Sequence, residues 1–376
     1  MSGIYLHIPF CKKACHYCNF HFSTSLKLKH ELIDALCREI GLRADYLGER
    51  TLSSIYFGGG TPSILDKTDL EHIWDALHKH FAWDKDIEIT LEANPDDLNY
   101  NKVKMLRDMG INRLSIGVQS FFDTDLQWMN RAHNEKEAVT AILNAQEAGI
   151  TNLTIDLIYG SPYTTHSMWQ KNIFKAMDMG IQHISAYCLT VEERTALHHM
   201  IKKGSFKPLN SESATEQFTY LMDTLTGNGY EHYEISNFAK PGFRAVHNTN
   251  YWQGVKYLGI GPAAHSYNGS SRSWNIANNK KYTDAITNGK LPQETEIITP
   301  AMKYNEYIMT GLRTVWGVET AYISNLGQSF LDDFLTNIEK HLISGDVMHH
   351  NNQYYLSRSG KYFADRIAMD LFWVEE

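Results

Sequence analysis

Up to about residue 200, the chain alternates between short apolar segments of strand character and longer segments with helical spacing. Six segments are predicted as strands: 3–8, 53–60, 86–93, 112–119, 152–160 and 183–190. The segments between them place apolar residues three and four positions apart, as in LEHIWDALHKHF. Repeated strand–helix–strand units imply parallel strands with right-handed crossovers. We therefore expect an α/β fold built on an open or partial (β/α)6 barrel.

Polar or glycine-rich motifs follow five of these strands: HIPFC, GGGTPS, LEANP, GVQSF and the end of DLIYGSP. Each motif alone is ordinary turn chemistry, because Gly, Pro, Asn and Ser are common in loops. In parallel α/β folds, however, the carboxyl ends of the strands meet on one side, where ligands bind. Five such ends favour a shared pocket over unrelated turns.

The alternation fades after about residue 200, and a helix is predicted over 211–226, followed by an irregular stretch over 227–290. Helices are then expected at 302–314, 318–324 and 328–343, before a hairpin that turns at Asn351 and Asn352 and a last helix. Helices followed by a hairpin predict a winged-helix-like C-terminal domain. We divide the chain into a barrel (1–210), a barrel extension (211–298) and this domain (299–376).

Charge and composition limit the partners. The formal net charge of -8 argues against nucleic acid, even for a winged-helix-like domain, and favours a docking or lid role for it. No apolar run reaches membrane-spanning length, and the N-terminus lacks the features of a signal peptide, so we expect a cytoplasmic protein without stable membrane insertion. Five cysteines are too few for a disulfide framework, and three of them cluster, which points to a metal site.

The clustered cysteines are Cys11, Cys15 and Cys18, in the pattern CxxxCxxC directly after the first strand. Three thiolates would hold a [4Fe–4S] cluster and leave one iron open to another ligand. The alternative is a zinc ion completed by one of the nearby histidines; these are His7, His16 and His21. The other two cysteines, Cys37 and Cys188, are expected to be buried, inert thiols.

The segment YLHIPFCKKACHYCNF, together with GGGTPS after the next strand, resembles the cluster loop of radical S-adenosylmethionine (SAM) proteins. Within them it resembles the branch that contains the oxygen-independent coproporphyrinogen III oxidases and the HemW group of heme chaperones. The resemblance extends over nearly the whole chain, to about residue 370. It implies that SAM binds the open iron and that an electron from the cluster can cleave SAM to a 5′-deoxyadenosyl radical.

The resemblance also implies residues for SAM. Tyr5 and Tyr17 would flank the cluster and the first SAM, and Glu92 would bind that SAM. The segment Gly59, Gly60 and Thr61 would let the methionine moiety approach the backbone.

Three further positions match those that hold a second SAM in the oxidases: Gln119, Arg131 and Asp156. Their alternative interpretation is solvated strand ends, or an ion pair between Arg131 and Asp156. Asp156 lies within an otherwise apolar strand, where an unpaired carboxylate would be unfavourable.

The chain departs from the oxidase pattern at Phe20, where the oxidases have a further cysteine, and it begins almost at the cluster loop. Its HNTNYW segment (His247 to Trp252) matches the HNxxYW motif of the HemW group. The imidazole of His247 would then contribute to heme binding from a partly exposed surface loop, with Tyr251 and Trp252 near the macrocycle. His265 lies near a position that contributes to SAM binding in the oxidases.

The leading hypothesis is a heme chaperone that carries a [4Fe–4S] cluster with exchangeable SAM, delivers heme to an acceptor protein and possesses no catalytic residue. A homodimer is compatible with it. The first alternative is an oxygen-independent coproporphyrinogen III oxidase, and the second is a radical SAM enzyme with another substrate, since a fold does not fix function.

Overall fold

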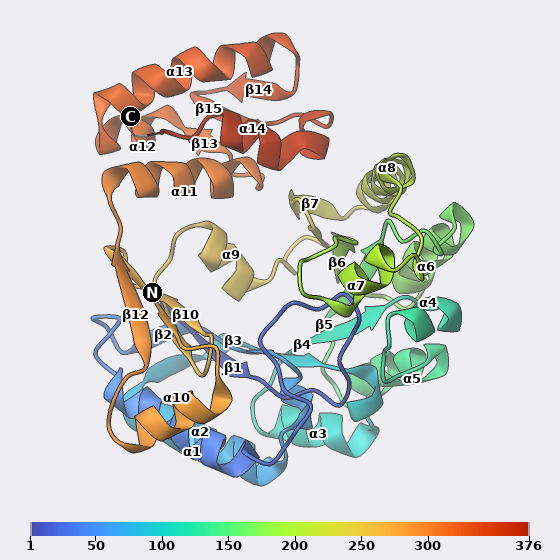
Figure 1. Cartoon of the computed structure of the whole chain (residues 1–376), viewed down its shortest axis with the longest axis vertical. Coiled ribbons are helices and arrows are strands. Elements are labelled where there is room, and N and C mark those ends of the chain that lie inside the picture. The colour runs from blue at the N-terminus through green and yellow to red at the C-terminus, as the bar shows by residue number, and fades with distance from the viewer. Residues whose placement is uncertain (1, 375–376) are drawn as a thin grey trace.

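A large curved sheet organises the computed structural model, which describes residues 2–374. Its centre is formed by six parallel strands in sequence order (Figure 1). They are β1 (Ser2–Ile8), β2 (Thr51–Gly59), β3 (Ala82–Ala93), β4 (Arg113–Gln119), β5 (Asn152–Tyr159) and β6 (His183–Cys188). The predicted (β/α)6 arrangement is confirmed. The largest difference at a strand start is in β3, which begins four residues before the predicted 86.

Helices cover the outer face of these strands (Figure 1). They are α1 (Lys29–Leu42), α2 (Lys67–His80), α3 (Tyr100–Asp108), α4 (Asp123–Trp128), α5 (Glu135–Glu147) and α6 (His166–Asp178), with short 3₁₀ turns at Pro62–Ile64 and Pro95–Asp97. Alternate strand residues such as Ile4, Leu6 and Ile8 are fully buried in the core between sheet and helices. Because side chains alternate across a strand, Tyr5 and His7 point to the opposite, concave face.

The stretch over 227–290 was predicted to be irregular, and this is wrong. It contains β7 (Glu231–Glu234), β8 (Asn237–Ala239), β9 (Tyr257–Ile260), β10 (His265–Tyr267) and β11 (Ser271–Asn275), and β12 (Gln293–Ile297) follows. These strands extend the sheet at both edges, in the order β12-β11-β10-β9-β1 and β6-β8-β7. Strands of three to five residues are too short to show a period, and the open edges of β1 and β6 provide the pairing that stabilises them.

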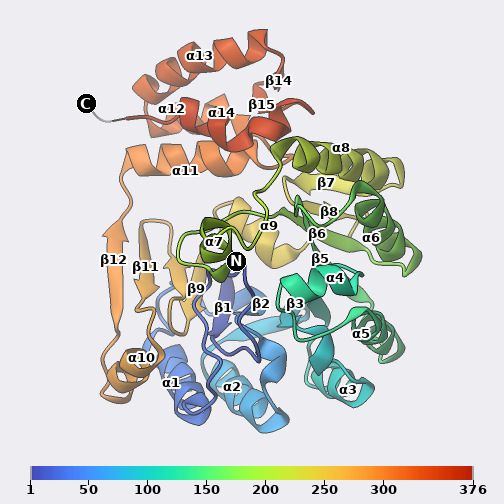
Figure 2. The same ribbon diagram turned by 45° about the vertical axis from the view of Figure 1, so that its right-hand side comes forward.

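Helix α7 (Ala196–Lys202) lies near the end of the barrel part, and three helices accompany the extension: α8 (Ser211–Gly227), α9 (Val246–Trp252) and α10 (Asn279–Thr287). The HNTNYW segment is therefore the helix α9 and not a surface loop, which corrects the expectation from sequence. In Figure 2 α9 lies behind α7, between the strands and the C-terminal domain. No helix described between residues 2 and 374 is long and apolar enough to cross a membrane.

The winged-helix-like part sits above the sheet and is reached through β12 (Figure 2). It consists of α11 (Pro300–Leu312), β13 (Val318–Glu319), α12 (Thr320–Leu326), α13 (Gln328–Ile343), β14 (Val347–His350), β15 (Gln353–Leu356), a 3₁₀ turn (Gly360–Phe363) and α14 (Ala364–Asp370). It has its own hydrophobic core. Asn351 and Asn352 both have positive φ, 50° and 63°, as a type I′ hairpin turn requires, so the predicted hairpin is confirmed.

Candidate functional site

The three clustered cysteines lie together in the loop that follows β1, and all are free and half-buried. The loop is closed on itself, since the Cys11 N–H donates to the Ser23 carbonyl at 3.0 Å. Burial raises the pKa of Cys11 and raises that of Cys18 to about 11. Both side chains are therefore neutral thiols until a metal displaces their protons, which is the usual behaviour of metal-binding cysteines.

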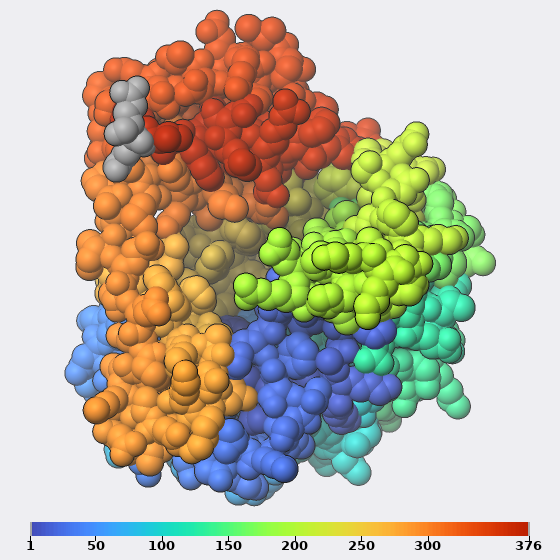
Figure 3. Space-filling model, viewed as in Figure 1, coloured from blue at the N-terminus to red at the C-terminus, as the bar shows by residue number. Residues whose placement is uncertain are grey.

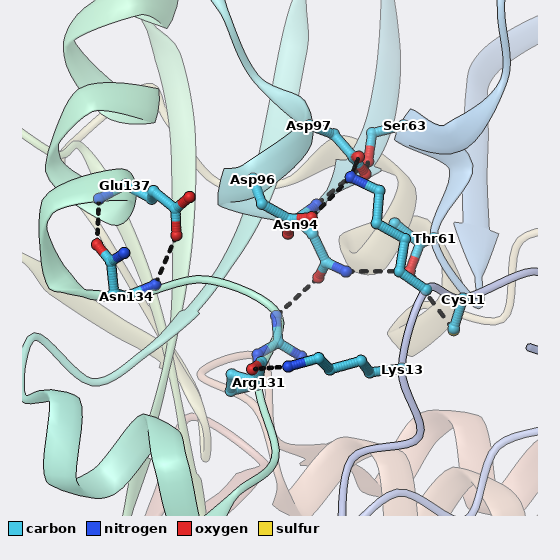
Figure 4. A network of polar contacts seen from close by, with 11 residues as sticks. Cys11, Lys13, Thr61, Ser63, Asn94, Asp96, Asp97, Arg131, Asn134 and Glu137 are labelled. Carbon is cyan, nitrogen blue, oxygen red and sulfur yellow. Dashed lines mark hydrogen bonds and ion pairs between the residues drawn. The ribbon is translucent and has the colours of Figure 1, made fainter.

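Arg131 joins the cysteine loop to the strand ends (Figure 4). Its Nη1 donates to Cys15 Sγ at 3.2 Å, and its Nη2 donates to Asn94 Oδ1 at 2.7 Å and to the Gly117 carbonyl at 2.8 Å. Tyr17 lies beside it, with its hydroxyl 3.5 Å from Nη1. The guanidinium thus stabilises the cysteine loop. Spacing along the chain could not reveal this contact.

A second brace holds the same loop and was missed from sequence. Lys12 pairs with Asp96 at 2.7 Å and also with Asp97. The Ser63 hydroxyl donates to Asp97 at 2.6 Å (Figure 4). Thr61 Oγ1 lies 3.5 Å from Cys11 Sγ. The two adjacent carboxylates after LEANP were the only sign of this contact in the sequence. Hydrophobic periodicity could not show that an exposed lysine from another loop pairs with them.

Of the three histidines considered for the zinc alternative, His7 uses both ring nitrogens in hydrogen bonds, and His16 and His21 use one each. His7 Nε2 contacts the His21 carbonyl at 3.0 Å and its Nδ1 contacts Tyr5, while His16 Nδ1 donates to the Trp128 carbonyl at 2.5 Å. His21 Nε2 is 2.7 Å from Asn279. Among residues 2–374, no three His, Cys, Asp or Glu side chains converge as a group that would hold a metal ion. A four-iron cluster needs no such convergence, because each thiolate binds a different iron, so the three free thiols fit it better than zinc.

Glu92 projects from the end of β3 towards the concave face. It accepts hydrogen bonds from the Tyr56 hydroxyl at 2.8 Å and from the Gly59 N–H at 3.1 Å. Burial raises the pKa of Glu92 despite these bonds. The Tyr5 ring is stacked on Tyr56 with 6.0 Å between centroids, so Tyr5 and Glu92 lie on one wall.

The glycines of GGGTPS are constrained by packing. Gly59 has a φ of +106°, and a Cβ there would lie 2.5 Å from the His7 ring. A Cβ on Gly60 would lie 2.8 Å from the backbone of Ile8 and Phe10. Both positions are therefore restricted to glycine by the close approach of β1 itself, and substitutions there would disturb the fold before they could report on a ligand.

Of the three residues proposed for a second SAM, Gln119 ends β4 and Asp156 lies on the neighbouring β5, whereas Arg131 lies in the loop after α4. Gln119 is buried with a φ of +65°, which is strained for a residue other than glycine, and such strain is common at ligand sites. A Cβ on Gly117 would contact both Gln119 and Arg131, so these two side chains meet above it. Asp156 is set apart by its pKa, which burial, and then the negative charge of Glu92, raise to about 7.

His247 lies at the base of the concave face. Its Nδ1 is 2.9 Å from the Ser54 hydroxyl, and its ring lies 5.0 Å from the Tyr56 ring. The N–H groups of Val246 and His247 both donate to the Glu88 carboxylate at 2.9 Å, which fixes the start of α9. Burial lowers the pKa of His247 to about 4.

The other two members of HNTNYW do not form one porphyrin box with His247. Tyr251 is half-exposed, and Trp252 lies under the Arg313 guanidinium at 5.8 Å. The cavity between His247 and Tyr251 has a volume of only about 10 Å³, room for one water at most. The space on this side of the imidazole is far too small for a macrocycle.

The two remaining cysteines differ from each other. Cys37 is half-buried with its thiol 3.5 Å from the His72 carbonyl, and burial raises its pKa to about 12, as expected for an unreactive thiol. Cys188 is exposed, so the prediction that it is buried is wrong. It is the last residue of β6, where the strand leaves the core.

A cavity of about 770 Å³ adjoins the cysteine loop. It is lined by Cys15, Cys18, Phe20 and Phe22 on one side and by residues 192–196 on the other. The Phe20 side chain is 69% exposed. The volume lies within the range of small-molecule sites. The sequence did not predict that residues 192–196 line this cavity, because they lead into α7 in a region without clear hydrophobic periodicity.

Comparisons with known proteins agree with this geometry. The profile described as the Radical SAM superfamily matches residues 5–176. The heme chaperone HemW of Bacillus subtilis is 33% identical over 372 residues, covering 98% of each chain, and that of Mycobacterium tuberculosis is 31% identical, covering 98% of this chain and 94% of its own. The structure of coproporphyrinogen III oxidase HemN from Escherichia coli, a radical SAM enzyme, superposes with a TM-score of 0.85 at 23% identity over 98% of this chain and 89% of its own.

Proposed function

The chain belongs to the HemW family within the radical SAM superfamily, and we propose that it is a heme chaperone, which binds heme and passes it to an acceptor protein. The observation that carries this proposal is the similarity to HemW along 98% of both chains. A match confined to the barrel would support only radical SAM chemistry in general. Here it includes α9 and the C-terminal domain as well.

We assign Cys11, Cys15 and Cys18 as ligands of a [4Fe–4S] cluster. When bound, this cluster supplies an open iron for SAM and a source of single electrons. The chain itself holds the loop in place, through Arg131 at Cys15 and through Lys12 at Asp96. The hydrogen bond from Arg131 also orients the Cys15 sulfur.

SAM would bind across the strand ends next to this loop. The proposed first set consists of Tyr5, Tyr17, Gly59, Gly60, Thr61 and Glu92, and the proposed second set of Gln119, Arg131 and Asp156. Glu92 has the clearest role, because its carboxylate is oriented by Tyr56 and Gly59 and still faces the concave side. Arg131 has the weakest claim to a second SAM, since its Nη atoms are committed to Cys15, Asn94 and Gly117.

In this proposal the cargo is heme, the partner is an acceptor protein and the location is the cytoplasm. His247 remains a candidate contributor to heme binding, whether the protein is a monomer or a homodimer. No nucleic acid is expected, because the charge balance is negative.

The second candidate function is an oxygen-independent coproporphyrinogen III oxidase, which the close likeness in fold to HemN favours. Phe20 opposes it. An exposed phenyl ring stands beside the cysteines where the oxidases of this branch carry another thiol, and a phenyl ring can neither ligate iron nor exchange a proton or hydrogen atom as a thiol does.

The decisive experiment is anaerobic reconstitution of the cluster, followed by parallel assays on one preparation. Heme is titrated and followed at the Soret band, and coproporphyrinogen III turnover is measured with SAM and a reductant. We expect saturable heme binding and no decarboxylated product. Turnover with only weak, nonsaturating heme association would assign the chain to the oxidases instead.

A further inference from the structure

We propose that heme binds on the concave face of β9, β10 and β11, with His265 of β10 as a ligand of the iron. This inference rests on the proposed chaperone function and names the site for its cargo. It moves the heme ligand away from α9, where the motif HNTNYW had placed it.

Strand register puts His265 on the wall that carries the SAM candidates. Gly3 of β1 pairs with Tyr257 of β9, and Tyr257 pairs with Tyr267 of β10. Directly paired residues point to the same face, and so do residues two apart in one strand. His265 therefore faces the same side as Tyr5, two residues after Gly3.

The opposite face of these strands is occupied by α1. Arg43 of α1 donates to Ser273 of β11 at 3.0 Å, and Ser273 pairs with the buried Ser266 of β10. Ser266 and Ser273 thus point towards the helix layer, and their neighbours His265 and Trp274 point away from it. Figure 3 shows that the surface is hollowed beneath the C-terminal domain, beside the atoms coloured orange.

His265 has the chemical state that an iron ligand needs. It is exposed, and neither ring nitrogen forms a hydrogen bond with any residue between 2 and 374. Either nitrogen of the neutral imidazole ring therefore has a lone pair accessible to an iron ion. His247, by contrast, faces a cavity of only about 10 Å³.

The surroundings of His265 suit a planar, apolar macrocycle with acidic side chains. The Trp274 ring is stacked on the imidazole with 6.0 Å between centroids, and Tyr267 and Tyr257 follow along the same face, 6.4 Å apart. Aromatic rings of this kind cover a porphyrin face. Arg272, paired in register with Tyr267, provides a cation for a propionate and is held by Glu306 of α11. An open face of this type would release heme to a partner more readily than a closed pocket.

The test compares ferric heme binding to the reconstituted protein in wild type, His265→Ala and His349→Ala. His349 is the matched control, because it is also exposed and stacked on an aromatic ring, at 4.3 Å from Tyr354, but lies on β14 of the C-terminal domain. We expect His265→Ala to weaken heme binding at least tenfold and to lose the electron paramagnetic resonance signature of imidazole-ligated ferric heme. Free imidazole should restore that signature. His349→Ala should equal wild type.

A ligand swap separates direct ligation from an effect on folding. His265→Cys should keep heme bound but give the spectrum of a thiolate ligand, a change that no structural role of His265 would produce. The iron content of the cluster, measured on the same samples, should be unchanged in all variants. An unaltered heme signature in both His265 variants refutes the site and leaves the chaperone function standing. Absence of saturable heme binding in wild type refutes the proposed function itself.

Discussion

The carboxylate of Glu39 offers the most direct test of how the wall carrying His265 is held in place. Glu39 lies on α1 and is fully buried. It accepts hydrogen bonds from the Tyr282 hydroxyl at 2.6 Å, the Asn275 side-chain amide at 2.7 Å and the Gly261 N–H at 2.8 Å, and it pairs with Arg43 at 3.3 Å. One side chain therefore links the first helix to α10 and to the strands of the barrel extension.

The expected loss of stability in Glu39→Leu follows from these contacts. Removing one partner of a buried ion pair costs about 3–5 kcal/mol, because it leaves the other charge without compensation. Each neutral donor left without an acceptor adds on the order of 1–3 kcal/mol, although such terms are not additive. We therefore expect a loss of roughly 5 kcal/mol or more, a large part of the total stability of an ordinary domain.

The assay is urea unfolding followed by circular dichroism, with heme titration of the folded fraction. Glu31→Leu is the control, since Glu31 is exposed on the same helix and its variant should change stability little. Glu39→Leu combined with Arg43→Met should recover part of the loss, because replacing both partners of a buried pair is far less harmful than removing one. A loss below about 1 kcal/mol in Glu39→Leu would refute the assignment of this network as the support of the wall.

Four further outcomes are expected. Iron analysis after anaerobic reconstitution should give about four irons per chain, lost in Cys11→Ala and kept in Cys37→Ala; stoichiometric zinc without iron would contradict the cluster. Glu92→Gln should weaken SAM binding in calorimetry by about 1–3 kcal/mol, since a buried acceptor for the ligand is lost; unchanged affinity would exclude this carboxylate. With Phe20 unchanged, the protein should make no protoporphyrinogen IX from coproporphyrinogen III, which product analysis by chromatography can check. Folding raises the pKa of Asp156 from the ordinary 3.8 to about 7, so ionisation of this carboxyl opposes folding and the protein loses stability as the pH rises between these values. Asp156→Asn should therefore raise the melting temperature more at pH 8 than at pH 5. An equal shift at both pH values would contradict the raised pKa.

The barrel could be predicted from sequence because its strands alternate with helix-length segments whose apolar residues have helical spacing. The hairpin at Asn351 and Asn352 was equally readable, since two consecutive asparagines tolerate the positive φ that its turn requires. The strands of 227–290 were not readable for a physical reason. A three-residue strand such as β10 exists because β9 and β11 pair with it, and this cooperation leaves no local trace in the sequence.

The candidate site divides in the same way. Cys11, Cys15 and Cys18 were evident because their chemistry depends on close spacing in one loop. The strain at Gln119 and the exposure of Cys188 are properties of tertiary packing, so residue type gave no indication of either. Arg131 was identified as a ligand-binding residue, but its contact with Cys15 connects two loops that only the folded barrel brings together.

The orientation of the His265 side chain follows from the pairing of neighbouring strands across the sheet. Between Tyr5 and His265 lie two strand pairings, each of which preserves the face of its partner, so the alternation that begins at the first strand fixes the orientation of a side chain on β10. A single-residue slip in either of these pairings would turn His265 into the helix layer, beside Arg43. The closeness of Gly259 to β10 guards against such a slip, because a Cβ there would meet the His265 carbonyl at 2.0 Å, a fit that only this register and a glycine allow. Cluster loop, SAM residues and the proposed heme ligand thus share one wall because one register runs through the whole sheet.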